Sequence, residues 1–341
     1  MTGMTGATKA RAGQDDDAAR PRRPLARSLI KLARPHQWAK GAFVVLGPFY
    51  GLPDLMERLK TTGGSIWGIA WDVLIVVASF SLVSSGCYVF NDLADAVQDR
   101  AHPRKRFRPI ASGDVSSRQA TTYGLCLIAV GFVILALLDG AVRPLVLVVM
   151  GLYVLNVQGY SMLFKRIVIL DVVSLSAGFV LRVLGGCAAV GIGPTTWLLN
   201  CTFFLSMFLA FGKRLGERRV MTAAGGADAA ATARAVQSVY TDELLRMAVV
   251  VTGVATLLTY AGYVQGKEEA YSAPWFNLLW LTVLPATYCL LRCIVLLENG
   301  DYDDPTELAV RDRPFQLGAA LFGLLTVGLI WWFRYHGAAL G

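Results

Sequence analysis

The amino-acid sequence predicts an all-α polytopic membrane protein with nine transmembrane helices around a central cavity. The chain has 341 residues, of which 55% are hydrophobic, a share typical of membrane-integrated proteins. Its apolar residues gather into separate segments of about 20 residues, the length at which a helix crosses a hydrocarbon core of about 30 Å. Its 32 Lys and Arg residues are concentrated in alternate connections between those segments.

Nine apolar segments follow one another along the chain. They cover residues 37–53, 67–91, 119–139, 143–163, 168–190, 195–212, 244–265, 274–297 and 315–336. The first contains Pro48, which a membrane helix tolerates where neighbouring groups satisfy the freed carbonyl. We therefore expect a nine-helix membrane domain over residues 36–338. The longest polar insert, over residues 213–243, is expected to be a variable loop with a short helix.

The segment over residues 1–35 is polar and basic, with Asp15 to Asp17 as its one acidic run. It lacks an apolar stretch followed by a small-residue cleavage site, which argues against a signal peptide. We expect a disordered cytosolic tail, because so polar a segment buries too little apolar surface to order itself. The six cysteines all fall inside apolar segments and form no CxxC pair, which indicates buried small hydrophobic side chains.

The distribution of Lys and Arg orients the helices. Of these residues, 24 fall in the tail and in the second, fourth, sixth and eighth connections, whereas five fall in the opposite set. Cytosolic segments of membrane proteins carry such an excess. We therefore expect a protein of the cell membrane with its N-terminus and active site in the cytosol and its C-terminus outside. No nucleic-acid partner is expected.

Residues 91–113 carry the strongest chemical signal. Four residues with acceptor oxygens open this stretch: Asn91, Asp92, Asp95 and Asp99. If the preceding helix continues, residues four apart fall near one face, and clustered oxygens suit Mg²⁺ together with substrate phosphates. A cationic cluster follows at His102, Arg104, Lys105, Arg106 and Arg108. The alternative is a solvated polar loop whose basic residues only set topology.

Further polar residues lie at the cytosolic ends of other segments. Lys40 is either a lysine that reaches back to the interface or a phosphate ligand. Tyr160 and Lys165 precede Asp171, which lies one turn inside an apolar helix, and Arg182 lies about three turns deeper. Ionisable groups at such depth usually face a polar cavity or a partner. Asp171 and Arg182 are too far apart along one helix to pair, so a site role is favoured for Asp171 and that of Arg182 stays open.

The sixth connection begins with Lys213, Arg214 and Glu217, which leave a membrane helix together. Lys213 and Glu217 lie four residues apart, so an ordinary helical ion pair is the alternative to a phosphate site. The mixed-charge connection over residues 298–313 has no assigned role beyond a cytosolic cap over the cavity.

Several of these motifs resemble the UbiA prenyltransferase superfamily. The pattern Asn91-Asp92-x-x-Asp95-x-x-x-Asp99 resembles its first aspartate-rich motif. The resemblance covers about residues 34–336 and implies a nine-helix membrane enzyme that binds an isoprenoid diphosphate through Mg²⁺. One branch, the decaprenyl-phosphate phosphoribosyltransferases of actinobacterial cell-wall synthesis, is resembled further. That likeness lies in His102 to Gly113, in Tyr160, Lys165, Asp171, Gly178 and Arg182, and in Gly212-Lys213-Arg214-x-x-Glu217.

One departure from the superfamily pattern bears on the substrate. Members with aromatic acceptors carry a second acidic motif, of DxxxD type, after the sixth helix, whereas this chain has Lys213-Arg214-Leu-Gly-Glu217. Extra cations suit a phosphate monoester. The resemblance then implies transfer of phosphoribosyl from phosphoribosyl diphosphate to decaprenyl (polyprenyl) phosphate, with release of diphosphate. The product would be decaprenylphosphoryl-5-phosphoribose for the arabinan of arabinogalactan and lipoarabinomannan.

This resemblance also implies roles for individual residues. Asp92, Asp95 and Asp99 hold Mg²⁺ with support from Asn91, and the metal and nearby cations stabilise the leaving diphosphate. A lipid phosphate oxygen, already anionic at pH 7, attacks ribose C1 without a catalytic base. Candidate phosphate ligands are Lys40, Lys105, Arg108, Lys165, Lys213 and Arg214, and further substrate-binding candidates are Tyr160, Arg182 and Glu217. Asp171 binds a ribose hydroxyl or metal.

Two alternatives stay open. The first is prenyl transfer to a small aromatic acceptor, against which the missing second acidic motif counts. The second is a secondary transporter with Asp171 and Arg182 at the midplane. No inverted repeat is visible and the acid cluster is interfacial, which counts against transport. Apart from the substrates and the lipid bilayer, the sequence leaves a homo-oligomer open as a further partner.

Overall fold

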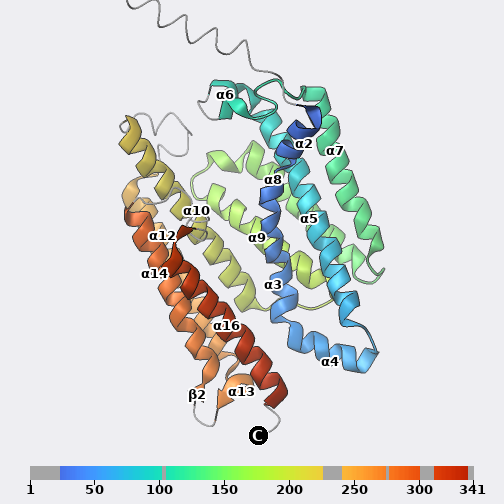
Figure 1. Ribbon diagram of the computed structural model, residues 1–341, viewed down its shortest axis with the longest axis vertical. Helices are drawn as coiled ribbons and strands as arrows, with labels where there is room; N and C mark the ends of the chain where they lie inside the picture. Colours follow the sequence, from blue (N-terminus) through green and yellow to red (C-terminus); the bar gives the residue numbers. More distant parts are fainter. Residues whose placement is uncertain (1–23, 102–104, 226–239, 274–275, 300–310, 337–341) are drawn as a thin grey trace, which may run out of the picture. The chain divides into compact units, whose positions relative to one another are not determined.

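The structure is a computed structural model that is almost entirely helical (Figure 1). It describes residues 24–101, 105–225, 240–273, 276–299 and 311–336. Eight of the described helices are long and apolar enough to cross a membrane. The all-α membrane fold is therefore confirmed. The described residues fall into two compact units, one within residues 1–39 and 81–133 and the other within residues 40–80 and 134–341.

Parts of three expected features lie outside the described residues. They are residues 1–23 of the tail, residues 226–239 of the polar insert and residues 300–310 of the mixed-charge connection.

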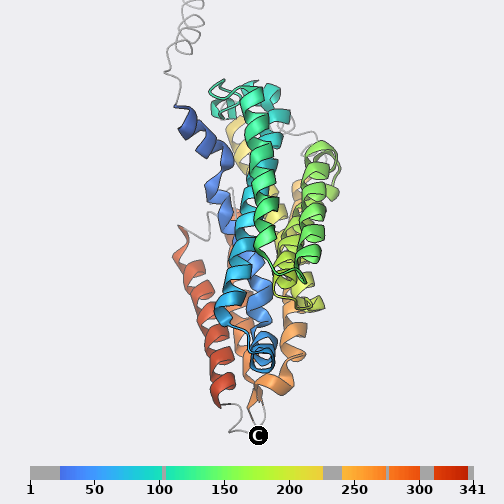
Figure 2. The same cartoon turned by 90° about the vertical axis from the view of Figure 1, so that its right-hand side faces the viewer.

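The first unit is built on the C-terminal part of one long helix. Its elements are α2 (Leu25–Ala33), the end of α5 (Ile66–Ala94), α6 (Ala96–Ala101), η2 (Lys105–Phe107) and α7 (Ser117–Val133). Figure 2 shows α5 as one continuous helix in light blue. Within the stretch expected as a tail, α2 buries Ser28, Leu32 and Ala33 and ends at Arg34 in the left-handed conformation. This short amphipathic helix is ordered because its apolar face packs on the core of the unit.

Helices α5 and α7 touch through their backbones. A Cβ built on Gly86 of α5 would lie 2.7 Å from the carbonyl oxygen of Gly124 in α7. A Cβ on Gly124 would lie 3.2 Å from side-chain atoms of Val89 and Phe90. Small residues of this kind let membrane helices approach closely. This contact between α5 and α7 fixes the C-terminal part of α5, which carries the acidic residues.

The second unit contains the remaining long helices. Its larger elements are α3 (Ala42–Tyr50), α4 (Leu52–Thr62), α8 (Arg143–Met162), α9 (Leu170–Ala189), α10 (Thr196–Gly225), α12 (Asp242–Gln265), α14 (Val283–Asn299) and α16 (Arg313–His336). The smaller ones are η3 (Ile134–Leu137), η4 (Phe164–Arg166), α13 (Glu268–Tyr271), η5 (Leu278–Thr282) and an antiparallel pair of two-residue strands, β1 (Ser272–Ala273) and β2 (Phe276–Asn277). Helix α9 packs against α3, α8 and α10, while α12 packs against α10 and α14 against α16.

The first expected span differs from the others. Instead of one helix over residues 37–53, the chain forms η1 (Pro35–Gly41), then α3, then α4. Pro48 lies inside α3, which ends at Tyr50 ahead of Gly51. Proline removes a helical hydrogen bond and glycine favours a helix end, which explains why this segment stays short. It is the reason that eight described helices, rather than nine, have the length and composition of a span.

The contact between α3 and α9 gives a test of the fold. A Cβ on Gly186 of α9 would lie 1.8 Å from the carbonyl oxygen of Val44 in α3. Gly186→Ala should therefore lower the free energy of unfolding by at least about 1–3 kcal/mol, the usual cost of overpacking. Thermal unfolding of the purified protein in detergent measures this. The matched control is Gly151→Ala in α8, where an added Cβ meets no atom within 4 Å. Equal melting temperatures for the two variants would contradict the α3–α9 packing.

Candidate functional site

Two buried carboxylates of the first unit converge on one arginine. Asp92, near the end of α5, is 3% exposed, and Asp99 in α6 is 4% exposed. Arg108, just after η2, donates from Nη1 to Asp92 Oδ1 at 3.1 Å and to Asp99 Oδ2 at 2.7 Å. The two acids lie seven residues apart, about two helical turns, which places them on the same side.

A second arginine reaches the same carboxylate from the end of α2. Arg34 Nη2 donates to Asp92 Oδ1, and its guanidinium carbon lies 5.2 Å from the centre of the Tyr88 ring. Two carboxylates and two guanidinium groups thus form an electrically neutral group: Arg34, Asp92, Asp99 and Arg108, here called the acid–arginine cluster. Sequence reasoning missed Arg34, because it lies 58 residues from Asp92 and no local spacing connects them.

The oxygen atoms beside this cluster fit Mg²⁺. Asn91 Oδ1 is buried and accepts no hydrogen bond from the described residues, an arrangement that is costly unless another group satisfies the oxygen. Together with Asp92 and Asp99 it supplies two carboxylates and one neutral oxygen, and Mg²⁺ typically adds water and substrate phosphate to such a set. Among the described residues, no three Asp, Glu, His or Cys side chains form a ligand group by themselves. Substrate oxygens would therefore complete the shell.

The other candidates in this stretch lie close by in the chain. Asp95 is half-buried at the one-residue break between α5 and α6. Its N–H donates to the Asn91 carbonyl at 3.0 Å, and its own carbonyl accepts from the Asp99 N–H at 2.8 Å, so helical hydrogen bonding continues through the break. Lys105 is half-buried in η2. His102 and Arg104 lie outside the described residues.

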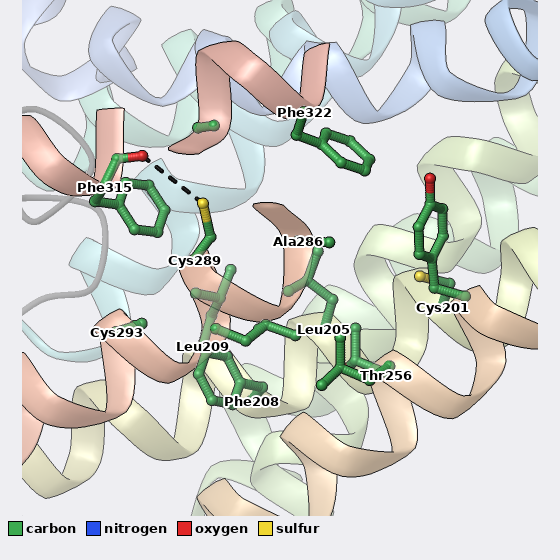
Figure 3. A pocket seen from close by; sticks show the side chains of 14 residues that line it. Cys201, Leu205, Phe208, Leu209, Thr256, Ala286, Cys289, Cys293, Phe315 and Phe322 are labelled. Atoms are coloured by element: carbon green, nitrogen blue, oxygen red, sulfur yellow. Dashed lines mark hydrogen bonds between the residues drawn. The ribbon is translucent and has the colours of Figure 1, made fainter. Parts of the chain in front are cut away.

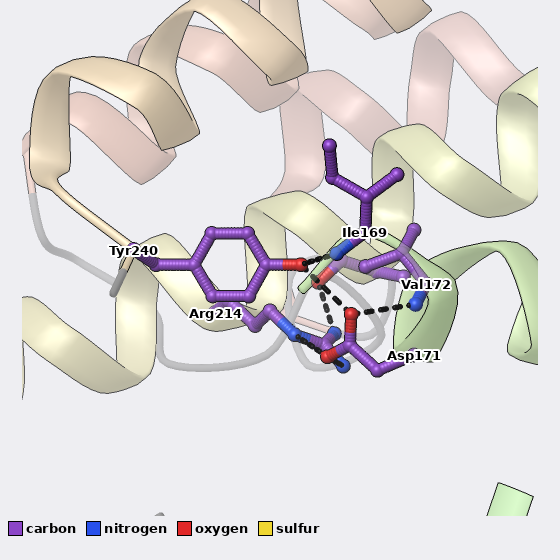
Figure 4. Close-up of polar contacts among 6 residues, drawn as sticks. Ile169, Asp171, Val172, Arg214 and Tyr240 are labelled. Atoms are coloured by element: carbon purple, nitrogen blue, oxygen red, sulfur yellow. Dashed lines mark hydrogen bonds and ion pairs between the residues drawn. The ribbon is translucent and has the colours of Figure 1, made fainter. Parts of the chain in front are cut away.

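Asp171 of the second unit lies in a separate buried network (Figure 4). Asp171 is 2% exposed and pairs with Arg214, which is 5% exposed. Arg214 Nε donates to Asp171 Oδ2 at 2.9 Å, and the Tyr240 hydroxyl donates to Asp171 Oδ1 at 2.7 Å. These residues come from α9, from α10 and from the chain just before α12, so the network joins three elements.

A strained residue adjoins this network. Ile169 has φ +69°, a conformation that a β-branched residue rarely adopts. Its N–H donates to the Tyr240 hydroxyl at 2.7 Å, which helps to hold it there (Figure 4). Burial raises the pKa of Tyr240 to about 12, so the phenol is protonated at neutral pH and can donate to Asp171. Sequence reasoning missed Tyr240, which falls in a polar insert without a recognisable motif.

The remaining candidates occupy different surroundings in the second unit. Arg182 is buried; its Nη2 donates to the Tyr153 hydroxyl at 2.6 Å, and its guanidinium carbon lies 4.8 Å from the centre of that ring. Lys40 Nζ lies 5.8 Å from the centre of the Phe179 ring. Lys213 is exposed, although its neighbour Arg214 is buried. Tyr160, Lys165 and Glu217 are half-buried.

An apolar cavity of about 220 Å³ lies among α10, α12, α14 and α16 (Figure 3). Helix α10 contributes Cys201, Leu205, Phe208 and Leu209 to its wall. These residues recur at helical spacing, and Lys213 continues the series four residues after Leu209. A hydrocarbon chain in the cavity and an anion at Lys213 would therefore lie along one face of α10.

Known proteins resemble this chain in sequence and in fold. The sequence pattern of the UbiA prenyltransferase family matches residues 59–311. The chain is 31% identical to a decaprenyl-phosphate phosphoribosyltransferase of Corynebacterium glutamicum, over 89% of this chain and 87% of that protein. It is also 31% identical to one of Mycobacterium tuberculosis, over 92% and 97%. A solved structure of a UbiA homolog from Archaeoglobus fulgidus bound to DMAPP and Mg²⁺ shares the fold, with a TM-score of 0.62 and 17% identity over 89% of this chain and 99% of that one.

The Asp171 network predicts a structural role for Tyr240. Tyr240→Phe should leave Asp171 Oδ1 and the Ile169 N–H without the hydroxyl, which costs about 1–3 kcal/mol of unfolding free energy. Folding raises the pKa of Tyr240 above its unfolded value near 10, so the contribution of the phenol to stability is fully present at any pH below about 10. That contribution is lost as the pH rises through about 12. Tyr240→Phe should therefore have a lower melting temperature than the parent protein at pH 7. Its stability should also lack the decrease that Tyr240 causes as the pH rises through about 12.

Tyr288→Phe is the matched control for this measurement, because Tyr288 is 47% exposed. It should unfold like the parent protein. If the two phenylalanine variants have the same melting temperature at pH 7, the hydrogen bonds of Tyr240 make no net contribution.

Proposed function

The chain belongs to the UbiA prenyltransferase family, and we propose that it transfers phosphoribosyl from phosphoribosyl diphosphate to decaprenyl phosphate or a related polyprenyl phosphate. The family makes it an integral membrane transferase. The observation that carries the finer proposal is the pairing, in one chain, of an acid–arginine cluster with an exposed lysine where a second acidic motif would stand. Two relatives named for this activity, each 31% identical over most of both chains, support the choice of substrates.

The acid–arginine cluster is suited to the diphosphate of the sugar donor. Asp92 and Asp99, with Asn91 Oδ1, would hold Mg²⁺, which supplies positive charge to the leaving diphosphate. The side chain of Arg108 is 29% exposed, so its guanidinium can donate to diphosphate oxygens while it stays near the acids. Asp95, half-buried between the two acids in sequence, is a further metal ligand in this proposal.

The lipid acceptor is assigned to the face of α10 that carries Lys213. In this proposal the ammonium group of Lys213 binds the lipid phosphate. The apolar cavity lined by Leu205 and Leu209 takes the first isoprene units. The buried pair of Arg214 with Asp171 fixes α10 and so positions Lys213. In this proposal Arg214 and Asp171 act as positioning residues, because both side chains are almost fully buried in their own network.

The reaction needs few functional groups from the protein. A lipid phosphate oxygen forms a bond to ribose C1 while the bond from C1 to the diphosphate breaks, and the electron pair leaves with the diphosphate. The ribose carries positive charge as this bond breaks, and the cations around the diphosphate stabilise the charge developing on the leaving group. A phosphate monoester is largely ionised at pH 7, so no side chain has to remove a proton. A soluble sugar donor also requires a cytosolic site, in line with the proposed orientation.

A transfer assay tests the proposed substrates. Purified protein, labelled phosphoribosyl diphosphate, decaprenyl phosphate and Mg²⁺ should give lipid-extractable label, and EDTA should abolish it. Asp99→Asn should reduce the rate about a hundred-fold or more, because it removes charge stabilisation at the leaving group. Asp114→Asn, which removes a carboxylate from the same unit outside the cluster, is the control and should keep full activity. If polyprenyl diphosphate and an aromatic acceptor react instead, and no label enters lipid, the substrates are wrong.

The assignment of Lys213 has its own test. Lys213→Ala should raise the KM for polyprenyl phosphate about ten- to a hundred-fold, the loss of one charge-assisted contact, and should leave the KM for the sugar donor nearly unchanged. Lys213→Arg keeps the charge and should recover most of the affinity. Equal effects of the alanine variant on both substrates would mean that Lys213 supports the site as a whole.

A further inference from the structure

Residues on either side of Arg34 hold its segment against α5, the helix that carries Asp92. Ser85 of α5 donates from Oγ to the Ala33 carbonyl at 2.6 Å, and Trp38 Nε1 donates to Ser85 Oγ at 3.0 Å. Ser85 is fully buried, and it lies seven residues before Asp92, which is two turns along the same side of α5. The segment that carries Arg34 is thus attached to the helix that carries its partner.

The backbone of Arg34 is held in an unusual conformation. Its φ is +52°, in the left-handed region, and it precedes Pro35, which disfavours helical geometry in the residue before it. Strain of this kind persists only where the surroundings enforce it, and it is frequent at functional sites. Here the contacts of Ser85 with Ala33 and Trp38, and the hydrogen bond from the Gln37 N–H to the Arg34 carbonyl at 2.9 Å, help to hold it. The observation indicates that the direction of the Arg34 side chain matters.

The charges of the cluster balance only while Asp92 and Asp99 are not bound to a metal. Arg34 and Arg108 both donate to Asp92 Oδ1, so that oxygen is already engaged by two cations. A divalent cation on the two acids would compete with both guanidinium groups for the carboxylates and would leave the cluster with an excess of two positive charges. An anion with several adjacent oxygens is then needed to restore neutrality. A diphosphate has this charge and these oxygens.

We infer that Arg34 is a ligand of the donor diphosphate and exchanges Asp92 for diphosphate oxygens when the acids bind metal. This inference rests on the proposed function. The Arg34 side chain is 25% exposed, so part of it is open to a ligand while it contacts the buried acid. Because Arg34 and Arg108 compete with a free divalent cation for Asp92, metal and diphosphate bind together.

Binding of Mn²⁺ tests this exchange without turnover. Electron paramagnetic resonance of the purified full-length protein reports free and bound Mn²⁺, with and without inorganic diphosphate. In the parent protein, diphosphate should tighten Mn²⁺ binding about ten- to a hundred-fold beyond the value expected from Mn²⁺–diphosphate association in solution. Arg34→Gln should bind Mn²⁺ alone more tightly than the parent, and the tightening by diphosphate should nearly disappear.

Arg27→Gln is the matched control. Arg27 is an exposed arginine of the same helix, so the variant loses the same charge and should behave like the parent protein. Tight binding of Mn²⁺ alone by the parent, or unchanged coupling to diphosphate in Arg34→Gln, would overturn the inference. If Arg34→Gln does not fold, Ser85→Ala replaces it, because it keeps Arg34 but removes its anchor. This variant should also weaken the coupling, and full coupling in it would overturn the inference.

The transfer assay and the Mn²⁺ binding experiment together distinguish a failure of the role of Arg34 from a failure of the proposed substrates. Coupled binding of Mn²⁺ and diphosphate in a protein that places no phosphoribosyl label in lipid would refute the substrates and support the role of Arg34. Label in lipid without such coupling would refute the role of Arg34 alone.

Discussion

A carboxylate buried in a membrane helix must be neutralised by the protein itself, and this constraint organises both units. Asp92 and Asp171 are each at most 3% exposed, and each is paired with arginine. Removing one partner of a buried ion pair typically costs about 3–5 kcal/mol, because a charge is left without compensation. Each acid therefore ties together elements that are distant in the sequence. For Asp171 these are α9 and α10, and for Asp92 they are α5, the end of α2 and the loop after η2.

The two ion-paired groups differ in how much of their arginine side chains is exposed. Arg214 is almost fully buried and also donates from Nη1 to the carbonyl of Ala210 in its own helix, so its geometry is fixed. Arg34 and Arg108 keep a quarter or more of their side chains exposed. The first arrangement suits a residue that positions its neighbours, and the second suits residues that exchange partners during a reaction. This difference agrees with the positioning role proposed for Arg214 and with the binding role proposed for Arg34 and Arg108.

The all-α membrane fold could be predicted from the sequence because membrane-spanning helices are recognised by their length and apolar composition. The sequence also predicted that the helix continues, so that Asn91, Asp95 and Asp99 fall near one face, and helical hydrogen bonding does run from Asn91 through Asp95 to Asp99. It did not predict that Arg108 joins Asp92 to Asp99. It did not identify Arg34 or Tyr240, whose partners lie 58 and 69 residues away. Such contacts depend on how the helices pack, and no local spacing encodes them. The short first segment was harder to predict, because the effect of Pro48 depends on neighbours that only the folded chain supplies.

The length of α5 has a consequence for the membrane around the protein. At about 1.5 Å per residue its 29 residues extend roughly 43 Å, well beyond a hydrocarbon core of about 30 Å. Asp92 lies near the end of this helix, so it falls at the level of the lipid headgroups when the helix is centred in the bilayer. A thicker bilayer would move hydrocarbon toward the acids and disfavour their charged ligands. If the acids bind metal and diphosphate as proposed, hydrophobic mismatch would change how favourably these charged ligands bind.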